Sequence, residues 1–161
     1  MVDIDSQANR RNQIIEAVKK VKGERRVLNC CTFRTEGSKS AIKTAGKGIG
    51  MTPEETAYIA NMIPVERGFN WSIHDCVYGN EEENRKPIKE FVDECNKYPN
   101  LLKVAEKIEG LICGRGIHAS AVYLFNEDFL EHNARMKAPN GVYTTQFNMD
   151  DSNEMSGLKM D

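Results

Sequence analysis

The chain has 161 residues, of which 40% are hydrophobic and 29% charged, and its formal net charge is −2 at pH 7. This composition is typical of a folded globular protein and excludes a disordered or fibrous one. The charge excludes a uniformly basic nucleic-acid-binding protein. No apolar run approaches the roughly 18 residues that a membrane span needs, and the acidic N-terminus does not resemble a signal peptide, so we expect no membrane partner.

Charge is distributed unevenly along the chain. Residues 1–50 carry eleven Lys and Arg against five Asp and Glu, a local charge of +6. Residues 51–161 carry eleven against nineteen, a local charge of −8. The basic N-terminal third predicts either a polyanion-binding face or an ordinary solvated surface.

The first part of the chain predicts a strand, a helix and a second strand. Residues 2–5 alternate apolar and acidic side chains, as a short half-buried strand does. Apolar residues at positions 14, 15, 18 and 21 then follow helical spacing, and Gly23 predicts the end of that helix. The apolar run over residues 27–33 predicts a buried strand.

The next segment predicts two helices. Over residues 35–48, lysines recur every four residues and share one face, where like charges repel unless phosphates, or solvent and counterions, neutralise them. Thr52 begins the other helix, because it is followed by Pro53 at the first helical position and by Glu55, which completes a capping box.

The middle of the chain predicts a helical region. Residues 64–86 are expected to be irregular, because they contain Pro64, Gly68, Gly79 and an acidic run at 81–83. Helices are expected over roughly residues 86–96 and 99–109, the second ending at Gly110.

The C-terminal part predicts a β-rich region. Residues 114–116 indicate a turn and residues 119–125 a strand. A turn at 139–141 separates strand candidates, with 142–147 as the return strand, and residues 157–161 indicate a last strand. The order α/β, all-α and β-rich favours a helical lobe inserted into an α/β lobe.

Asp3 and Asp5 are candidate metal ligands. On a strand, residues two apart place their side chains on the same face, roughly 6.5–7 Å apart. Like charges so placed repel unless a cation lies between them, and Mg²⁺ prefers carboxylate oxygens. Spacing alone leaves a metal role and an idle terminal pair both open, for these residues and for Asp161.

The other chemistry-bearing residues form no catalytic pattern. The five cysteines include no C-x-x-C pair, which favours reduced thiols in a cytoplasmic protein over a disulfide framework or a zinc site. The three histidines are not at metal-ligand spacing, and His118 is predicted to be a buried, hydrogen-bonded side chain. The sequence contains no Walker A, G-x-G-x-x-G or Ser/His/Asp arrangement.

Four blocks of the sequence together resemble the bacterial C-family replicative DNA polymerases, the DNA polymerase III alpha subunits. Residues 3–5, DID, followed by 11–15, RNQII, resemble the opening strand and helix of their palm. Residues 32–43, TFRTEGSKSAIK, resemble the family's TFGT…AKAAIR, and residues 107–119, KIEGL to GIHA, resemble KLEG…GxHAAGV. Residues 145–161, TQFNMDD to GLKMD, resemble TQFDMDD…GLLKMD.

The resemblance implies a fold and a division of the chain. It implies an α/β palm, which is a nucleotidyltransferase-like mixed sheet with flanking helices, and an inserted all-α thumb lobe. Residues 1–34 would be the first palm segment, residues 35–110 the helical thumb and residues 111–161 the second palm segment. The palm would then bring the two ends of the chain together.

The resemblance also implies a metal site. The family places three aspartates around two Mg²⁺ ions, for which Mn²⁺ can substitute. Asp3, Asp5 and Asp161 correspond to them here and would be both catalytic residues and metal ligands. The ions would activate a primer 3′-hydroxyl and neutralise charge on the phosphates of an incoming deoxynucleoside triphosphate.

Four lysines are the predicted phosphate-binding residues. Lys159 resembles the family's palm lysine near the triphosphate, or is an ordinary surface lysine. Lys39, Lys43 and Lys47 would face the phosphates of primer–template DNA, a mode of binding that does not depend on sequence.

The chain departs from the family pattern at three positions within these blocks. Arg34, Ser120 and Asn148 stand where glycine, alanine and aspartate are usual, and none of them is one of the three carboxylates. The family's Gly-Ser phosphate loop precedes the first aspartate and its fingers follow the third. We therefore expect these 161 residues alone to incorporate little or no nucleotide, and other replisome subunits to bind through regions absent here.

Two alternatives remain open from the sequence. One is a non-enzymatic DNA-binding module, in which the basic N-terminal third binds DNA and the carboxylates are idle. The other is a metal-dependent phosphohydrolase of unrelated fold, which would need more His and Asp ligands than this sequence offers.

Overall fold

A computed structural model describes residues 4–154 and 158–160 of the chain. The chain forms two compact units. One unit combines the residues up to Arg34 with those from Gly114 onward, and the other is Thr35–Cys113. No helix in the described ranges is long and apolar enough to cross a lipid bilayer.

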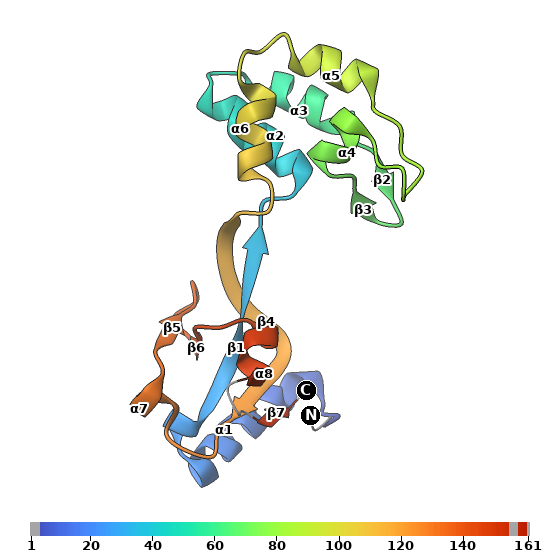
Figure 1. Ribbon diagram of the computed structural model, residues 1–161. Helices are drawn as coiled ribbons and strands as arrows, with labels where there is room; N and C mark the ends of the chain where they lie inside the picture. The colour runs from blue at the N-terminus through green and yellow to red at the C-terminus, as the bar shows by residue number, and fades with distance from the viewer. Residues whose placement is uncertain (1–3, 155–157, 161) are drawn as a thin grey trace. The chain divides into compact units, whose positions relative to one another are not determined.

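The first unit is a mixed sheet with flanking helices, which confirms the predicted α/β class (Figure 1). Its elements are η1 (Ala8–Arg10), α1 (Arg11–Lys22), η2 (Glu24–Arg26), β1 (Val27–Thr35), β4 (Ile112–Leu124), α7 (Phe129–His132), β5 (Arg135–Lys137), β6 (Tyr143–Thr145), α8 (Met149–Glu154) and β7 (Leu158–Met160). The strand order is β5-β6-β1-β4-β7. β1 is parallel to β6, whereas β5 is antiparallel to β6 and β7 is antiparallel to β4.

The core of this unit lies between β1, β4 and the segment that follows β4. Val27 to Cys31 are all buried, as the apolar run predicts. The Tyr123 hydroxyl donates a hydrogen bond to the Met149 carbonyl at 3.0 Å, which ties α8 to the sheet. The buried cluster consists of Leu28, Cys30, Ala121, Tyr123, Phe125 and Phe129.

The N-terminal segment differs from its prediction. Ile4 and Asp5, the described part of the expected strand 2–5, belong to no strand, because a strand requires a ladder partner and residues 4–7 have none among the described residues. Helix α1 ends at Gly23 as expected, where φ is +99° and the glycine N–H donates to the Lys19 carbonyl at 2.7 Å. No residue of α1 is fully buried.

The second unit is mainly helical. Its elements are α2 (Ser38–Gly48), α3 (Pro53–Asn61), β2 (Val65–Glu66), β3 (Phe69–Asn70), α4 (Ile73–Tyr78), α5 (Lys89–Cys95) and α6 (Leu101–Ile108). The capping box at Thr52 is confirmed: the Glu55 N–H donates to the Thr52 hydroxyl at 3.2 Å, and the Thr52 N–H donates to the Glu55 carboxylate at 2.8 Å.

Two predictions about local structure are wrong. The segment 64–86 is not irregular throughout, since it contains the β2–β3 hairpin and helix α4. Gly114 and Gly116 do not form a turn, because they lie inside β4, where pairing with a neighbouring strand outweighs the turn preference of glycine. The turn at 139–141 is confirmed between β5 and β6.

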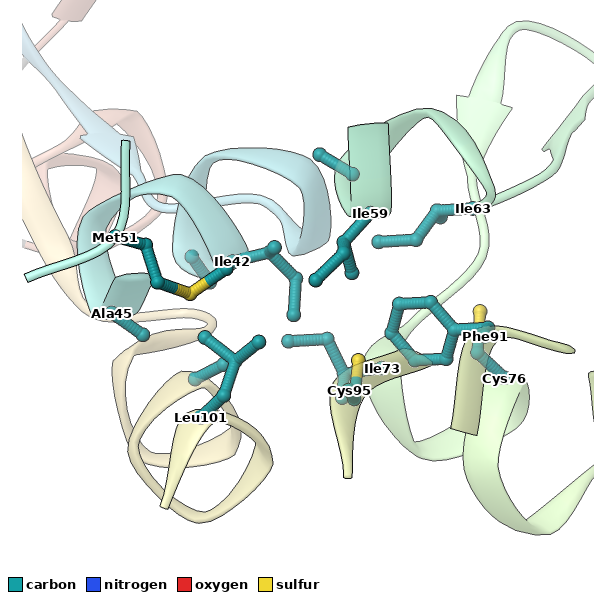
Figure 2. Packing of buried hydrophobic residues seen from close by; sticks show 13 residues of the cluster. Ile42, Ala45, Met51, Ile59, Ile63, Ile73, Cys76, Phe91, Cys95 and Leu101 are labelled. Atoms are coloured by element: carbon teal, nitrogen blue, oxygen red, sulfur yellow. The ribbon is translucent and has the colours of Figure 1, made fainter. Parts of the chain in front are cut away.

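Side chains from five helices form the core of the second unit (Figure 2). Ile42 of α2, Ile59 of α3 and Phe91 of α5 are completely or almost completely inaccessible to solvent. Leu101 of α6 and Ile73 of α4 pack into the same cluster. This core belongs to the helical unit alone, so the unit has a hydrophobic centre of its own.

An ion pair between the buried Asp75 and the partly buried Arg85 ties the loop before α5 to the rest of this unit. The Arg85 guanidinium donates to the buried carboxylate of Asp75 and, at 2.9 Å, to the carboxylate of Glu66. It also lies 5.0 Å from the ring centre of Trp71, within cation–π range. Burial raises the pKa of Asp75, but hydrogen bonds from Arg85 and Asn80 outweigh it and leave the pKa below its ordinary value.

Truncating a core side chain of the second unit is expected to lower its stability strongly. Phe91→Ala should lower the free energy of unfolding by about 3–5 kcal/mol, because it leaves a cavity in a fully buried site. Phe69→Ala is the matched control: this ring is 78% exposed, and its removal should change the free energy by less than about 0.5 kcal/mol. Urea denaturation followed by circular dichroism measures both. Equal losses in the two variants would contradict the assigned core.

The contribution of Asp75 to stability is expected to disappear in acid. A carboxyl whose folded pKa lies below its unfolded value of 3.8 stabilises the fold fully above that value. That contribution is lost as the pH falls through the folded pKa. The difference in unfolding free energy between the wild type and Asp75→Asn should therefore be constant above about pH 5 and shrink below about pH 4. Urea titrations from neutral pH to about pH 3 test this, and a gap that stays constant throughout would refute it.

Candidate functional site

The predicted carboxylates are only partly within the described chain. Asp3 and Asp161 lie outside the described residues, and Asp5 is exposed in the segment before η1. Within residues 4–154 and 158–160, no group of three or more His, Cys, Asp or Glu side chains is arranged to hold a metal ion. Asp5 is thus the one predicted metal ligand whose surroundings the structure gives.

A hollow joins the neighbourhood of Asp5 to the C-terminal strand. Ile4, the residue before Asp5, lines it together with Met160, the residue before Asp161. Met160 pairs with Val122 of β4, which lines the same hollow. The remaining lining residues are Ser6, Arg11, Ile14, Ile15, Val18 and Ser120. Asp5 and Asp161 are 156 positions apart in the sequence. Their neighbours Ile4 and Met160 nevertheless line the same hollow.

A polar contact crosses the edge of this hollow. The Arg11 guanidinium at the start of α1 donates a hydrogen bond to the Ser120 carbonyl of β4 at 2.8 Å. Two residues before Ser120, the Nδ1 atom of His118 accepts the Ala121 N–H at 2.9 Å. His118 is hydrogen-bonded as predicted, although its side chain is partly and not fully buried.

Lys159 occupies the middle of β7. It pairs with Tyr123 on the antiparallel neighbour β4 and is partly buried. Because side chains alternate along a strand, Lys159 lies on the face of β7 opposite to Met160 and its hollow.

The three predicted thumb lysines lie on α2 in the second unit. Lys43 and Lys47 are exposed and Lys39 is partly buried, while Ala41, Ile42 and Ala45 of the same helix are buried. Among the described residues, none forms an ion pair with these three lysines. Four-residue spacing places them in a row along one face of the helix.

The first unit has a second surface hollow that the sequence analysis did not predict. Arg34 and Arg115 line a hollow with Phe33, Gly114 and Gly116. A Cβ atom at Gly114 would lie 3.3 Å from the Arg34 guanidinium, so that side chain lies close over the glycine. In the sequence, Arg34 stands out only as a departure from the family pattern. Its proximity to Gly114 depends on strand pairing that no local pattern reveals.

Comparison with known proteins gives consistent relatives along the whole chain. The family model of the bacterial DNA polymerase III alpha NTPase domain matches residues 2–161. A probable DNA polymerase, YorL, of Bacillus subtilis strain 168 is 48% identical over 160 residues, covering 99% of this chain and 12% of the relative. A DNA-directed DNA polymerase of Bacillus phage SPbeta has the same identity and coverage.

A more distant relative agrees with these two. The DNA polymerase III subunit alpha of Bacillus subtilis is 29% identical over 161 residues, covering 99% of this chain and 14% of the relative. The chain thus spans 12–14% of the length of these curated relatives. The match to nearly every residue confirms the resemblance inferred from the four sequence blocks: the chain belongs to the bacterial DNA polymerase III alpha family.

Proposed function

We propose that the chain is part of a DNA-directed DNA polymerase that adds nucleotides to a primer 3′-hydroxyl during DNA replication. The observation that carries this proposal is the family match over residues 2–161. In this proposal the first unit is the palm and the second is the thumb inserted into it. Primer–template DNA and deoxynucleoside triphosphates are the substrates, and other replisome subunits bind parts of the polymerase outside these residues.

Asp3, Asp5 and Asp161 are the residues that would hold two Mg²⁺ ions. The hollow lined by Ile4 and Met160 supports this, because it draws together the chain next to Asp5 and the chain next to Asp161. The exposed Asp5 carboxylate offers the hard oxygen donors that Mg²⁺ prefers. When bound, the ions supply charge neutralisation at the reacting phosphate and activation of the attacking hydroxyl.

Lysine side chains would position the phosphates. Lys159, held in register on β7 by its pairing with Tyr123, would orient the triphosphate of the incoming nucleotide. Lys39, Lys43 and Lys47 would contact the backbone of the duplex from the exposed side of α2. Such contacts set the position of DNA without selecting its sequence, as replication of any template requires.

The competing function is a DNA-binding module without catalysis. The lysine row on α2 favours it, because DNA binding by that row does not need the carboxylates. The two functions differ in one respect: only the polymerase requires Asp5.

Removing the Asp5 carboxylate should distinguish a polymerase from a DNA-binding module. In the full-length polymerase, Asp5→Asn should lower the rate of primer extension by at least about a hundredfold, because an amide cannot supply the negative charge that a metal ligand provides. The affinity for primer–template DNA, measured by fluorescence anisotropy, should be unchanged.

The control for that experiment is Asp93→Asn. Asp93 is an exposed carboxylate on α5 of the other unit, and its loss should leave primer extension at the wild-type rate. If Asp5→Asn extends primers as well as Asp93→Asn does, the metal-ligand role of Asp5 is wrong. Wild-type protein that binds DNA but extends no primer would favour the binding module.

Neutralising the lysine row should weaken DNA binding in a salt-dependent way. In Lys39→Gln/Lys43→Gln/Lys47→Gln, the slope of log K against log salt should become shallower by about 2–3, because each lost phosphate contact removes about 0.9. The loss should be equal for unrelated duplex sequences. Anisotropy titrations at several salt concentrations measure both quantities.

A matched triple variant controls for net charge. Lys86→Gln/Lys89→Gln/Lys103→Gln removes three exposed positive charges from the same unit but from other segments. Its salt slope should stay close to that of the wild type. Equal slopes in the two triple variants would show that α2 is not the DNA-facing helix.

A further inference from the structure

The segment that carries Asp5 is held against the sheet with little hydrophobic burial. No residue of α1 is fully buried, and Ile14 and Val21 are 41% and 79% exposed. Apolar packing at such exposure contributes a fraction of what a core side chain does. A polar contact therefore has a large share in fixing where this helix, and the residues before it, lie on the sheet.

Arg11 supplies that contact. It is the first residue of α1, six positions after Asp5, and its guanidinium donates to the Ser120 carbonyl at 2.8 Å. A hydrogen bond from a charged donor is stronger than one between neutral groups. It joins residues 109 positions apart and reaches the strand that is paired with β7.

His118 binds the backbone next to the carbonyl that accepts this hydrogen bond. Its Nδ1 atom accepts the Ala121 N–H at 2.9 Å and the Ser120 N–H at 3.3 Å, so the ring binds two amides of its own strand. The ring thereby fixes the backbone at residues 120 and 121, from which the Ser120 carbonyl meets Arg11.

We propose that Arg11 and His118 are positioning residues for the metal-binding carboxylates. His118 holds the β4 backbone so that the Ser120 carbonyl is presented, and Arg11 uses this carbonyl to hold the Asp5 segment beside β4 and β7. Neither side chain needs to touch substrate in this role. The inference rests on the proposed polymerase function. It adds the contact, between Arg11 and the backbone that His118 holds, which positions the segment of Asp5.

Four single variants in the full-length polymerase test the positioning roles of Arg11 and His118. Arg11→Ala removes the donor and Arg11→Lys keeps one, while His118→Ala removes the acceptor and His118→Asn places an amide oxygen near the position of Nδ1. Arg11→Ala and His118→Ala should each lower kcat for primer extension about tenfold and raise the Mg²⁺ concentration for half-maximal rate. The KM for primer–template DNA should not change. A general loss of folding would also lower the apparent kcat, but it would not raise the Mg²⁺ concentration that the remaining folded molecules need.

Rescue and coupling make the test specific. Arg11→Lys and His118→Asn should each recover at least half of the lost rate on a logarithmic scale. The double variant Arg11→Ala/His118→Ala should lose little more than either single variant, since both act through one contact. Lys20→Ala, which removes a charge from an exposed position of the same helix, should behave as the wild type.

Each outcome decides between roles. Wild-type kcat and Mg²⁺ dependence in Arg11→Ala would overturn the role of Arg11. Where the alanine variant does not fold, an Arg11→Lys variant that folds but still loses kcat about tenfold would overturn it. His118→Asn as impaired as His118→Ala would show that Nδ1 is not the atom that matters. If Asp5→Asn is inactive while both alanine variants are fully active, only this inference fails; if Asp5→Asn is itself active, the proposed function fails.

Discussion

The pairing of β4 is the constraint on which the first unit depends. β4 lies between β1 and β7 in the sheet, so it connects the strand that follows α1 to the strand at the C-terminal end of the chain. The same strand accepts the hydrogen bond of Arg11 through Ser120. One strand therefore organises segments from both ends of the sequence, and the hollow between Ile4 and Met160 is a consequence of that arrangement.

The helical unit does not depend on this constraint. It is a continuous segment, Thr35–Cys113, with its own hydrophobic core and with the Asp75–Arg85 ion pair. Because its buried side chains hold α2 from one side, the lysines on the other side are presented on a rigid support. Such a support suits contacts that position a phosphate backbone, since ordering those side chains costs less when the helix beneath them is already fixed.

Local chemistry predicted much of the fold, and long-range pairing accounts for the errors. The capping box at Thr52, the stop at Gly23 and the turn at 139–141 are set by neighbouring residues, and all three were predicted. Gly114 was misassigned because its strand conformation comes from pairing across the sheet. The Arg11–Ser120 bond joins residues 109 apart, so no periodic pattern in the sequence could reveal it. The roles of Asp3, Asp5 and Asp161 come from resemblance and remain predictions.

The two parts of the first unit are held by different kinds of interaction, and this bears on function. Around Tyr123 and Phe129, side chains are almost completely buried, and the strands there are fixed by packing. Around α1, the contact is a partly exposed apolar face with one charged hydrogen bond. A metal-binding carboxylate must reach solvent and substrate, so its side chain cannot be enclosed by packing. Polar contacts that fix direction at small buried area suit such a position, because they orient the segment without closing it off from water.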